Sequence, residues 1–516
     1  MANLTDLEYL RLNRWNRFIY RFSHFFTEKL PNGLKNFFVG TGRRIAGAAK
    51  KVGAECVDIW STFVNGDWKT KLSFLVMGFG NLARGQILRG ILFLLFEIVF
   101  IFYMVTTGAY WLSMLPSLGL QGPSKEYDPI YDTEITIPHD NSFKILLYGV
   151  LTIFFIIAFI YTWRVNVRQN KLAEQILKSG KKLRSGREDL RSMVDDQFHK
   201  TLLALPLTGI IIFTVLPIVF MILVAFTNYD GAHNGYSNAL FSWVGWKNFD
   251  TMLNWSNNSG TQSYSATFGE VLTWTLIWAF FATFTNYFLG MFVAMAINKK
   301  GIKLKKVWRT ILVLTIAIPQ FISLLYVSKM FAKDGILNGF LLSMGWISQA
   351  IDFWGDTANN GLLARIMVIV INIWIGIPYL MLIVTGILMN IPADLYESAR
   401  IDGANAWQQY TKITLPYMLF ITGPYLLTSF TGNMNNFNVI YLLTGGAPTN
   451  AAASSAAGAV GFTDLLITWL FKITTGAGNY YYLASVVGIL VFVVVAVISL
   501  IVYNVLPSIK NEEDFQ

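Results

Sequence analysis

Cysteine is almost absent from this chain of 516 residues, which has a single cysteine, Cys56, and four histidines. One cysteine excludes an internal disulfide and offers no set of ligands for a structural metal. A nucleotide-binding loop of the pattern Gly-x-x-x-x-Gly-Lys-Ser/Thr is also missing. We therefore expect that this chain does not cradle ATP phosphates in the usual way.

Charged residues are also scarce: they make up 14% of the chain, against 54% apolar residues. This is the composition of a membrane protein. The first long apolar run begins near Ile87, so we expect no cleavable signal peptide. About 20 apolar residues cross a hydrocarbon core. By that rule the sequence predicts an all-α integral membrane protein with about eight spans, at residues 87–107, 145–163, 202–227, 270–297, 307–331, 364–389, 416–444 and 482–505.

The net charge of +10 is unevenly distributed between the loops. Lys and Arg are concentrated in 164–200 and 299–309, whereas 116–144 is rich in Asp and Glu. Basic loops stay in the cytoplasm by the positive-inside rule. Alternation then places both termini and residues 390–416 in the cytoplasm. Because the basic excess follows topology, we expect no nucleic acid partner.

Residues 1–85 do not resemble a core domain. Between residues 10 and 26, apolar and aromatic residues alternate with Arg11, Arg17 and Arg21. This pattern is typical of an amphipathic helix on an anionic membrane surface, with partner binding as the alternative. We expect two accessory spans and a basic linker over 86–200, and a six-helix core over 201–510. Glu97 lies within the first span, where an ionisable group serves a site or pairs with a neighbouring helix.

Residues 390–416, between the sixth and seventh spans, form a polar segment with helix signals. Pro392 can start a helix that has Asp394 and Glu397 near its positive end. Gly403 supplies a left-handed stop, and 404–414 can form a second short helix. We expect a bent, ordered knob at the membrane face and call residues 390–416 the coupling knob.

The sixth and seventh spans contain unusual polar residues. The sixth includes NIWIGIPY at 372–379, and the seventh includes SFTGNMNNFN at 429–438. Unpartnered amides in lipid cost about 1–3 kcal/mol each. They must therefore line water, a ligand or another chain. Neutral amides and hydroxyls suit the hydroxyl groups of a carbohydrate, whereas the alternative is that they join helices to one another.

The coupling knob resembles the "EAA loop" of bacterial ABC importer permeases, which docks into a cleft of the ATP-hydrolysing subunit. The matching positions are Glu397, Ser398, Ala399, Gly403, Ile413, Leu415 and Pro416. Ser398 replaces the usual first Ala of the motif, which is an exchange of one small residue for another.

NIWIGIPY, DLYESARIDGA, KITLP and SF-x-x-N-x-NNF together resemble the MalF-type subunit of maltose/maltodextrin ABC importers, over roughly residues 200–510. The resemblance implies a type I ABC importer permease core with a sugar site halfway across the membrane. Gly432 stands where the family can have a Phe that packs on a sugar ring. The positions that match the sugar site are Asn372, Ile375, Gly376, Tyr379, Ser429, Gly432, Asn433 and Asn436.

The same resemblance implies a multi-pass permease of the bacterial cytoplasmic membrane that moves maltose or maltodextrins by alternating access. It implies no catalytic residues, with ATP and magnesium bound by two MalK-type ATPase subunits. The other partners are a homologous MalG-type permease and an extracytoplasmic sugar-binding protein. Alternatives are a permease for another oligosaccharide, an ion-coupled transporter using Glu97 or Glu270, and a membrane-embedded glycosyltransferase.

Overall fold

The computed structural model describes residues 30–130, 132–137, 139–234, 239–254, 264–299, 301–453 and 460–505. The predicted amphipathic stripe at residues 10–26 lies outside them. The chain forms two compact units, Met1–Met221 with Gly235–Ser242, and Ile222–Asn234 with Trp243–Gln516. Within these described residues, seven helices are long and apolar enough to span a membrane, and a bent helix pair makes an eighth candidate. The prediction of an all-α membrane protein with about eight spans is confirmed.

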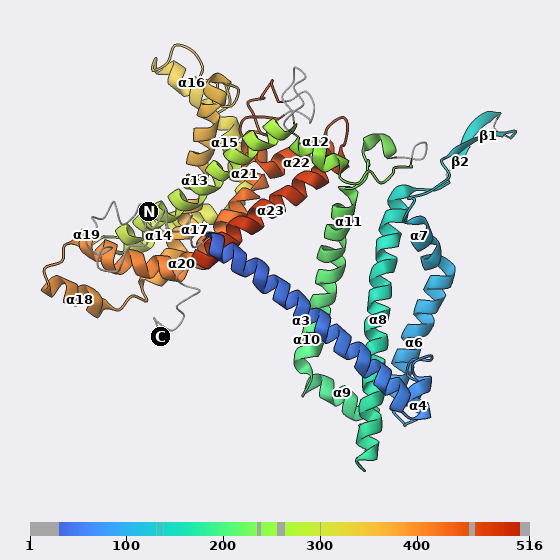
Figure 1. Ribbon diagram of the computed structural model, residues 1–516. Helices are drawn as coiled ribbons and strands as arrows, with labels where there is room; N and C mark the ends of the chain where they lie inside the picture. Colours follow the sequence, from blue (N-terminus) through green and yellow to red (C-terminus); the bar gives the residue numbers. More distant parts are fainter. Residues whose placement is uncertain are drawn as a thin grey trace. The chain divides into compact units, whose positions relative to one another are not determined.

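The first unit contains the two accessory spans, a small hairpin and the third span up to Met221, so that only the last turn of α11 belongs to the second unit (Figure 1). The β1–β2 hairpin is antiparallel and connects the first span to the second. The elements are α3 (Leu30–Asn65), α4 (Trp68–Leu72), α5 (Phe79–Leu82), α6 (Ile87–Tyr103), η2 (Met104–Gly108), α7 (Ala109–Met114), β1 (Ser124–Asp128), β2 (Thr133–Ile137), α8 (Ser142–Lys178), α9 (Gly186–Val194), α10 (Phe198–Ile210), η3 (Ile211–Val215) and α11 (Leu216–Val224).

Glu97 is buried in this unit and has a backbone partner. Its Oε2 accepts a hydrogen bond from the Met77 amide at 2.7 Å. Nearby, the Arg84 guanidinium donates to Asp67 at 2.5 Å and to Asn170 at 2.9 Å. Buried charges require such partners. Of the two roles open to Glu97, the structure therefore supports pairing within its own unit.

The second unit holds the coupling knob and the other predicted site residues. Its elements are η4 (Gly231–His233), α12 (Lys247–Leu253), α13 (Tyr264–Asn298), α14 (Lys305–Ala317), α15 (Gln320–Met330), α16 (Ile336–Ser343), η5 (Ala358–Asn360), α17 (Leu362–Leu388), α18 (Ala393–Ile401), α19 (Ala406–Gln409), η6 (Tyr410–Thr414), α20 (Leu415–Met434), α21 (Phe437–Leu443), α22 (Leu466–Thr475) and α23 (Tyr481–Val505).

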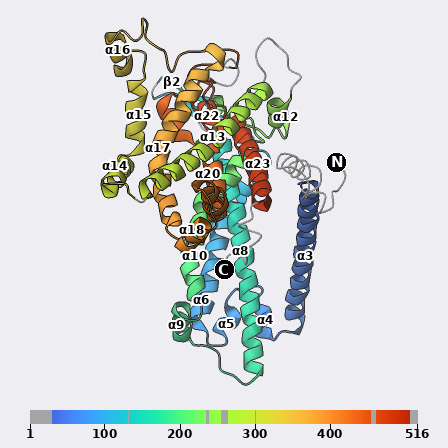
Figure 2. The same ribbon diagram turned by 90° about the vertical axis from the view of Figure 1, so that its left-hand side faces the viewer.

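The predicted fifth span, 307–331, is not one helix. α14 and α15 meet at a bend of 90° (Figure 2). Pro319 removes an amide donor and pushes Ile318 into the extended region, where its ψ is 124°. The predicted span is therefore present as a bent pair of helices, and the proline inside the apolar run is the physical reason for the break.

The predicted seventh span, 416–444, is also interrupted. α20 ends at Met434, and α21 begins at Phe437 after Asn435 and Asn436. The Asn436 side chain accepts a hydrogen bond from the Val439 amide at 3.4 Å and so caps α21. One of the predicted sugar-site amides thus also starts a helix.

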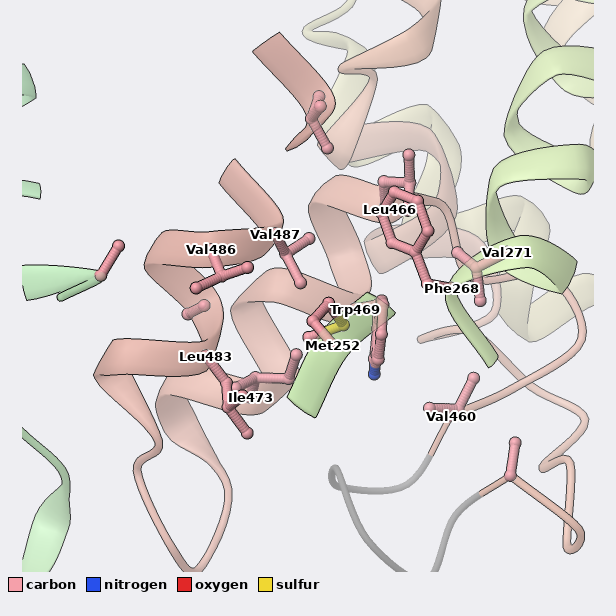
Figure 3. Packing of buried hydrophobic residues seen from close by; sticks show 14 residues of the cluster. Met252, Phe268, Val271, Val460, Leu466, Trp469, Ile473, Leu483, Val486 and Val487 are labelled. Atoms are coloured by element: carbon pink, nitrogen blue, oxygen red, sulfur yellow. The ribbon is translucent and has the colours of Figure 1, made fainter. Parts of the chain in front are cut away.

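Three apolar clusters of described residues lie in the second unit, and two of them concern the helices discussed below. Around α22 and α23, buried side chains including Phe268, Trp469 and Val487 form one cluster (Figure 3). At the end of the bundle nearest the coupling knob lies another, which we call the central cluster. Its buried members are Tyr287, Met291, Ala294, Leu380, Met381, Val384 and Met418, from α13, α17 and α20.

α22 is a short apolar helix that does not reach the length of a membrane span. Its Leu466, Trp469 and Ile473 side chains are almost fully buried. The apolar face of this helix therefore packs against its own unit. Asp464, just before it, pairs with Lys472 at 2.6 Å and fixes the start of the helix.

The contact between α13 and α17 generates a prediction about stability. A Cβ atom on Gly290 of α13 would lie 2.7 Å from Leu380 Cβ, whereas a Cβ on Gly386 of α17 would meet nothing within 4 Å. We expect Gly290→Ala to lower the melting temperature, because overpacking costs about 1–3 kcal/mol. Gly386→Ala is the matched control and should keep or raise it, since Ala favours helix. Equal melting temperatures in detergent would contradict the close packing.

Candidate functional site

The coupling knob consists of two short helices joined by a left-handed turn. Pro392 precedes α18 and Asp394 lies in its first turn, as the sequence predicts. Gly403 has φ +75°, and the Ala404 amide donates to the Ala399 carbonyl at 2.8 Å. That hydrogen bond closes the end of α18. The predicted bend at Gly403 is confirmed.

The second helix of the knob is not separate from the next span. A capping box between Asn405 and Gln408 starts α19. The helix then continues through η6, a π-helical turn at Tyr410–Thr414, directly into α20. The second short helix expected over 404–414 is present from Ala406, and it runs on into the next span. A displacement of α19 acts directly on α20 because no loop lies between them.

A side-chain hydrogen bond stiffens the knob. The Tyr396 hydroxyl lies 2.8 Å from Thr414 Oγ1, which ties α18 to η6. The outer face of the knob is exposed and mixed in character: Glu397 and Ser398 lie beside Ile401 and Trp407, which are 87% and 70% exposed. Large apolar side chains exposed on a polar segment are typical of a docking surface.

The base of the knob packs into the bundle. Tyr410 and Leu415 contact the central cluster, and Ile413 is half-buried. Pro416 lies at the start of α20 and remains exposed. Figure 1 shows α18 and α19 projecting beyond the ends of α17 and α20. The predicted motif residues therefore divide into an exposed set on the knob and a packed set at its base.

Asn372 and Gly376, both predicted for the site, face the middle of α13. A Cβ on Gly376 would lie 2.6 Å from Asn286 Nδ2, so the glycine admits the amide. Asn286 Nδ2 donates to the Ala282 carbonyl at 2.8 Å and to the Asn372 carbonyl at 3.5 Å. Asn286 Oδ1 and Asn372 Nδ2 are buried and have no hydrogen-bond partner among the described residues.

The amides of α20 approach the same helix from another side. Asn433 Nδ2 donates to Thr283 Oγ1 at 3.0 Å, and Asn436 Nδ2 donates to Asn433 Oδ1 at 3.3 Å. The indole of Trp278 donates to the Asn433 carbonyl at 3.1 Å. We call Thr283, Asn286, Asn372, Asn433 and Asn436 the polar layer.

The remaining predicted residues surround this layer less closely. Ile375 packs against an apolar cluster, whereas Tyr379 is 53% exposed and Gly432 is also exposed. Ser429 is half-buried on α20. Three of the eight predicted residues, Asn372, Gly376 and Asn433, therefore meet α13, and Asn436 joins them through its bond to Asn433.

Sequence reasoning missed the α13 side of the layer. Thr283 and Asn286 lie three residues apart on one face of an apolar span, within FATFTNYF. Asn286 is an amide inside a predicted span, which is the same signal that identified Asn372. The role of Asn286 depends on tertiary packing, because α13 is the helix that both α17 and α20 contact.

The polar layer offers neutral donors and acceptors. Its amides and hydroxyl match a ligand that presents many hydroxyl groups. The two unsatisfied amide atoms retain hydrogen-bonding capacity, and buried polar groups normally have partners. Asn433 and Asn436, by contrast, already hold helices to one another, as the interhelical alternative expected.

Comparison with known proteins gives relatives along most of the chain. A family described as "Binding-protein-dependent transport system inner membrane component" matches residues 286–511. The maltodextrin transport system permease protein MalC of Streptococcus pneumoniae is 31% identical over 452 residues, which cover 86% of this chain and 97% of MalC.

Two further relatives bear on the type of permease. The galactooligosaccharides transport system permease protein GanP of Bacillus subtilis is 31% identical over 439 residues, 85% of this chain and 97% of GanP. The maltose/maltodextrin transport system permease protein MalF of Escherichia coli is 33% identical over 261 residues, 50% of this chain and 48% of MalF. The predicted resemblance to MalF-type permeases is confirmed.

The hydrogen bonding of the polar layer predicts opposite effects of two similar substitutions. The Asn372 Nδ2 donor is buried and has no hydrogen-bond partner among the described residues. Asn372→Leu removes this unsatisfied donor, so we expect an unchanged or higher melting temperature. Asn433→Leu breaks the bond to Thr283 and should cost about 1–3 kcal/mol. Thermal unfolding of the purified protein in detergent measures both. Equal destabilisation would mean that Asn372 already has a partner in the folded chain.

Proposed function

Since this chain belongs to the binding-protein-dependent transport permeases and is a permease subunit of a sugar ABC importer, we propose that it carries malto-oligosaccharides by alternating access. Relatives that share 30% or more of its sequence over most of its length include a permease named for maltodextrin. Neutral amides in the middle of the bundle suit such a cargo.

One observation carries this proposal: the coupling knob and the polar layer belong to a single packed body. Tyr410 and Leu415 at the base of the knob contact the central cluster. Tyr287, in the same cluster, lies one residue after Asn286 and bonds Thr422 of α20 at 2.8 Å. A force on the knob therefore reaches the polar layer through buried side chains, which transmit strain because they are close-packed.

The proposed cycle begins with delivery of the sugar by an extracytoplasmic binding protein. A second, homologous permease subunit completes the pathway. Two ATPase subunits bind ATP and magnesium, and their closure moves the coupling knob. Glu397, Ser398, Ala399 and Gly403 set its docking, while Ile413, Leu415 and Pro416 connect it to α20. The rigid shift turns α17 and α20, so that the sugar site opens alternately to the two sides.

Within the pathway, Asn372 and Asn433 would hold sugar hydroxyls, with Ser429 on α20 and Asn436 at the start of α21 beside them. Gly376 keeps the helices close enough for the layer to form. Ile375 and Tyr379 would bound the path on α17, and the exposed Gly432 leaves room opposite. Both termini and the knob would then lie in the cytoplasm of a bacterial cell, as the basic loops require.

A galacto-oligosaccharide is the second candidate cargo. The permease GanP is as similar to this chain as MalC is. Hydroxyl recognition by amides serves both sugars equally well. Position 432 is a glycine and not a phenylalanine, so a sugar ring has no aromatic side chain to pack on there. Such a side chain would otherwise favour one orientation of the ring. Both sugars therefore remain candidate cargoes, and they differ in the linkage and the length of the oligosaccharide chain.

The bend of the knob predicts which substitutions uncouple transport. Gly403 has φ +75° and open space around it. Gly403→Val places a β-branched residue in the left-handed region at a cost of about 1–3 kcal/mol, whereas Asn tolerates that region. We expect Gly403→Val to lose most sugar uptake and sugar-stimulated ATP hydrolysis, and Gly403→Asn to keep most of both. Full transport by the Val variant would refute the coupling role of the bend.

The cargo can be tested in the reconstituted assembly with a ladder of glucose oligomers and a matching ladder of galactose oligomers. We expect glucose oligomers to stimulate ATP hydrolysis, and Asn372→Leu to raise their KM by about tenfold through loss of one or two hydrogen bonds. Stimulation by galactose oligomers alone would select the second candidate. Uptake that survives ATP depletion but stops with an uncoupler would instead indicate an ion-coupled transporter.

A further inference from the structure

A cavity lies at the ends of α13 and α17 that are farther from the coupling knob. It has a volume of ≈ 510 Å³ and is lined by Ala266, Gly269, Glu270, Thr273, Trp274, Ile277, Asn360 and Arg365. We call it the Glu270–Arg365 hollow. Glucose-sized ligands typically occupy concave sites of a few hundred Å³ with a few polar groups on apolar walls. This composition matches that description.

The charged walls of the hollow are held in fixed positions. The Arg365 guanidinium stacks at 4.7 Å over the Trp274 ring, and its Nε donates to the Phe462 carbonyl at 2.7 Å. The Trp274 indole is itself bonded to the Thr463 carbonyl at 3.2 Å. Such second contacts orient a binding side chain in advance of its ligand.

Glu270 completes the opposite wall. Its Oε2 accepts a hydrogen bond from Asn450 Nδ2 at 3.1 Å, and its carboxylate attracts the Arg365 guanidinium. The two charges offset each other, so the hollow favours a neutral ligand over an anion or a cation. Charged groups nevertheless form stronger hydrogen bonds to hydroxyl groups than neutral groups do.

Arg365 retains unused donors. A guanidinium has five N–H groups. Among the described residues, the Nε group is the only Arg365 donor with a hydrogen-bond partner. Neither Nη atom is one of the buried side-chain atoms that lack a partner. These Nη groups therefore have free donor capacity beside the hollow. Thr273 and Asn360, both exposed, add a hydroxyl and an amide to the lining.

We propose that the Glu270–Arg365 hollow is a second carbohydrate subsite, which binds one ring of an incoming oligosaccharide before that sugar reaches the polar layer. This inference rests on the proposed function. Arg365 precedes Asn372 by two helical turns on one face of α17. That separation is about 10 Å along the axis. One extended oligosaccharide reaches both sites, whereas a disaccharide occupies one at a time.

The subsite is tested by chain length. Thr273→Val and Asn360→Gly remove two lining polar groups without strain, since Asn360 has φ +60°. Glu270→Gln removes the charge and keeps the acceptor for Asn450. In the reconstituted importer we expect each change to raise the KM for maltoheptaose about three- to tenfold. The KM for maltose should stay unchanged.

Thr285→Val provides the matched control. Both residues lie on α13, Thr273 exposed and Thr285 half-buried, and each donates its hydroxyl to the carbonyl four residues earlier. Only Thr273 lines the hollow, so Thr285→Val should leave the chain-length profile as in the unmodified protein. Equal KM shifts for maltose and maltoheptaose in the hollow variants, or no shift for either, would overturn the subsite.

Direct occupancy can be measured with a single thiol. Cys56 is the chain's only cysteine and can be replaced by Ser before Thr273→Cys is introduced. We expect maltoheptaose to slow labelling of that thiol by a polar maleimide, and to leave a Thr285→Cys thiol unaffected. Unprotected labelling would count against the subsite while leaving the proposed function intact. Failure of the unmodified importer to transport any glucose oligomer would instead remove the proposed function, and the subsite with it.

Discussion

The close approach of α13 and α17 is the constraint on which the second unit depends. Gly290 lets Leu380 approach the α13 backbone, and Gly376 admits the Asn286 amide. In a membrane, helices associate through such close contacts, because lipid supplies no hydrophobic force between them. The same two contacts bring the central cluster and the polar layer into adjacent turns. Stability and the proposed site therefore share one interface.

The polar layer shows how amides can serve two purposes in one bundle. Asn433 and Asn436 are hydrogen-bonded to each other; Asn433 also donates to Thr283, and Asn436 caps the start of α21. These two amides therefore hold helices together. Asn286 and Asn372 keep unsatisfied atoms in the same layer. A bundle that oriented its amides only for packing would pair these as well. The remaining capacity favours a ligand that arrives and leaves, as a transported sugar does.

Apolar runs and loop charges were enough to predict the spans and the polar knob, because both follow from transfer energies that depend on local sequence. The breaks at Pro319 and Asn435 were missed, since a run of apolar residues hides a local interruption. Asn372 and Asn433 were singled out by their amides within apolar spans together with the family resemblance. Their shared partner helix was not, because the contacts of Asn286 depend on tertiary packing.

The central claim is that buried side chains transmit movement from the coupling knob to the polar layer. A change at Met418 tests this claim most directly, because Met418 is fully buried in the central cluster. It belongs neither to the coupling knob nor to the polar layer. In the reconstituted importer, Met418→Ala leaves a cavity between them. The account predicts that maltodextrin still binds and basal ATP hydrolysis persists, while stimulation of hydrolysis by the sugar is lost. Undiminished stimulation in a folded Met418→Ala variant would contradict it.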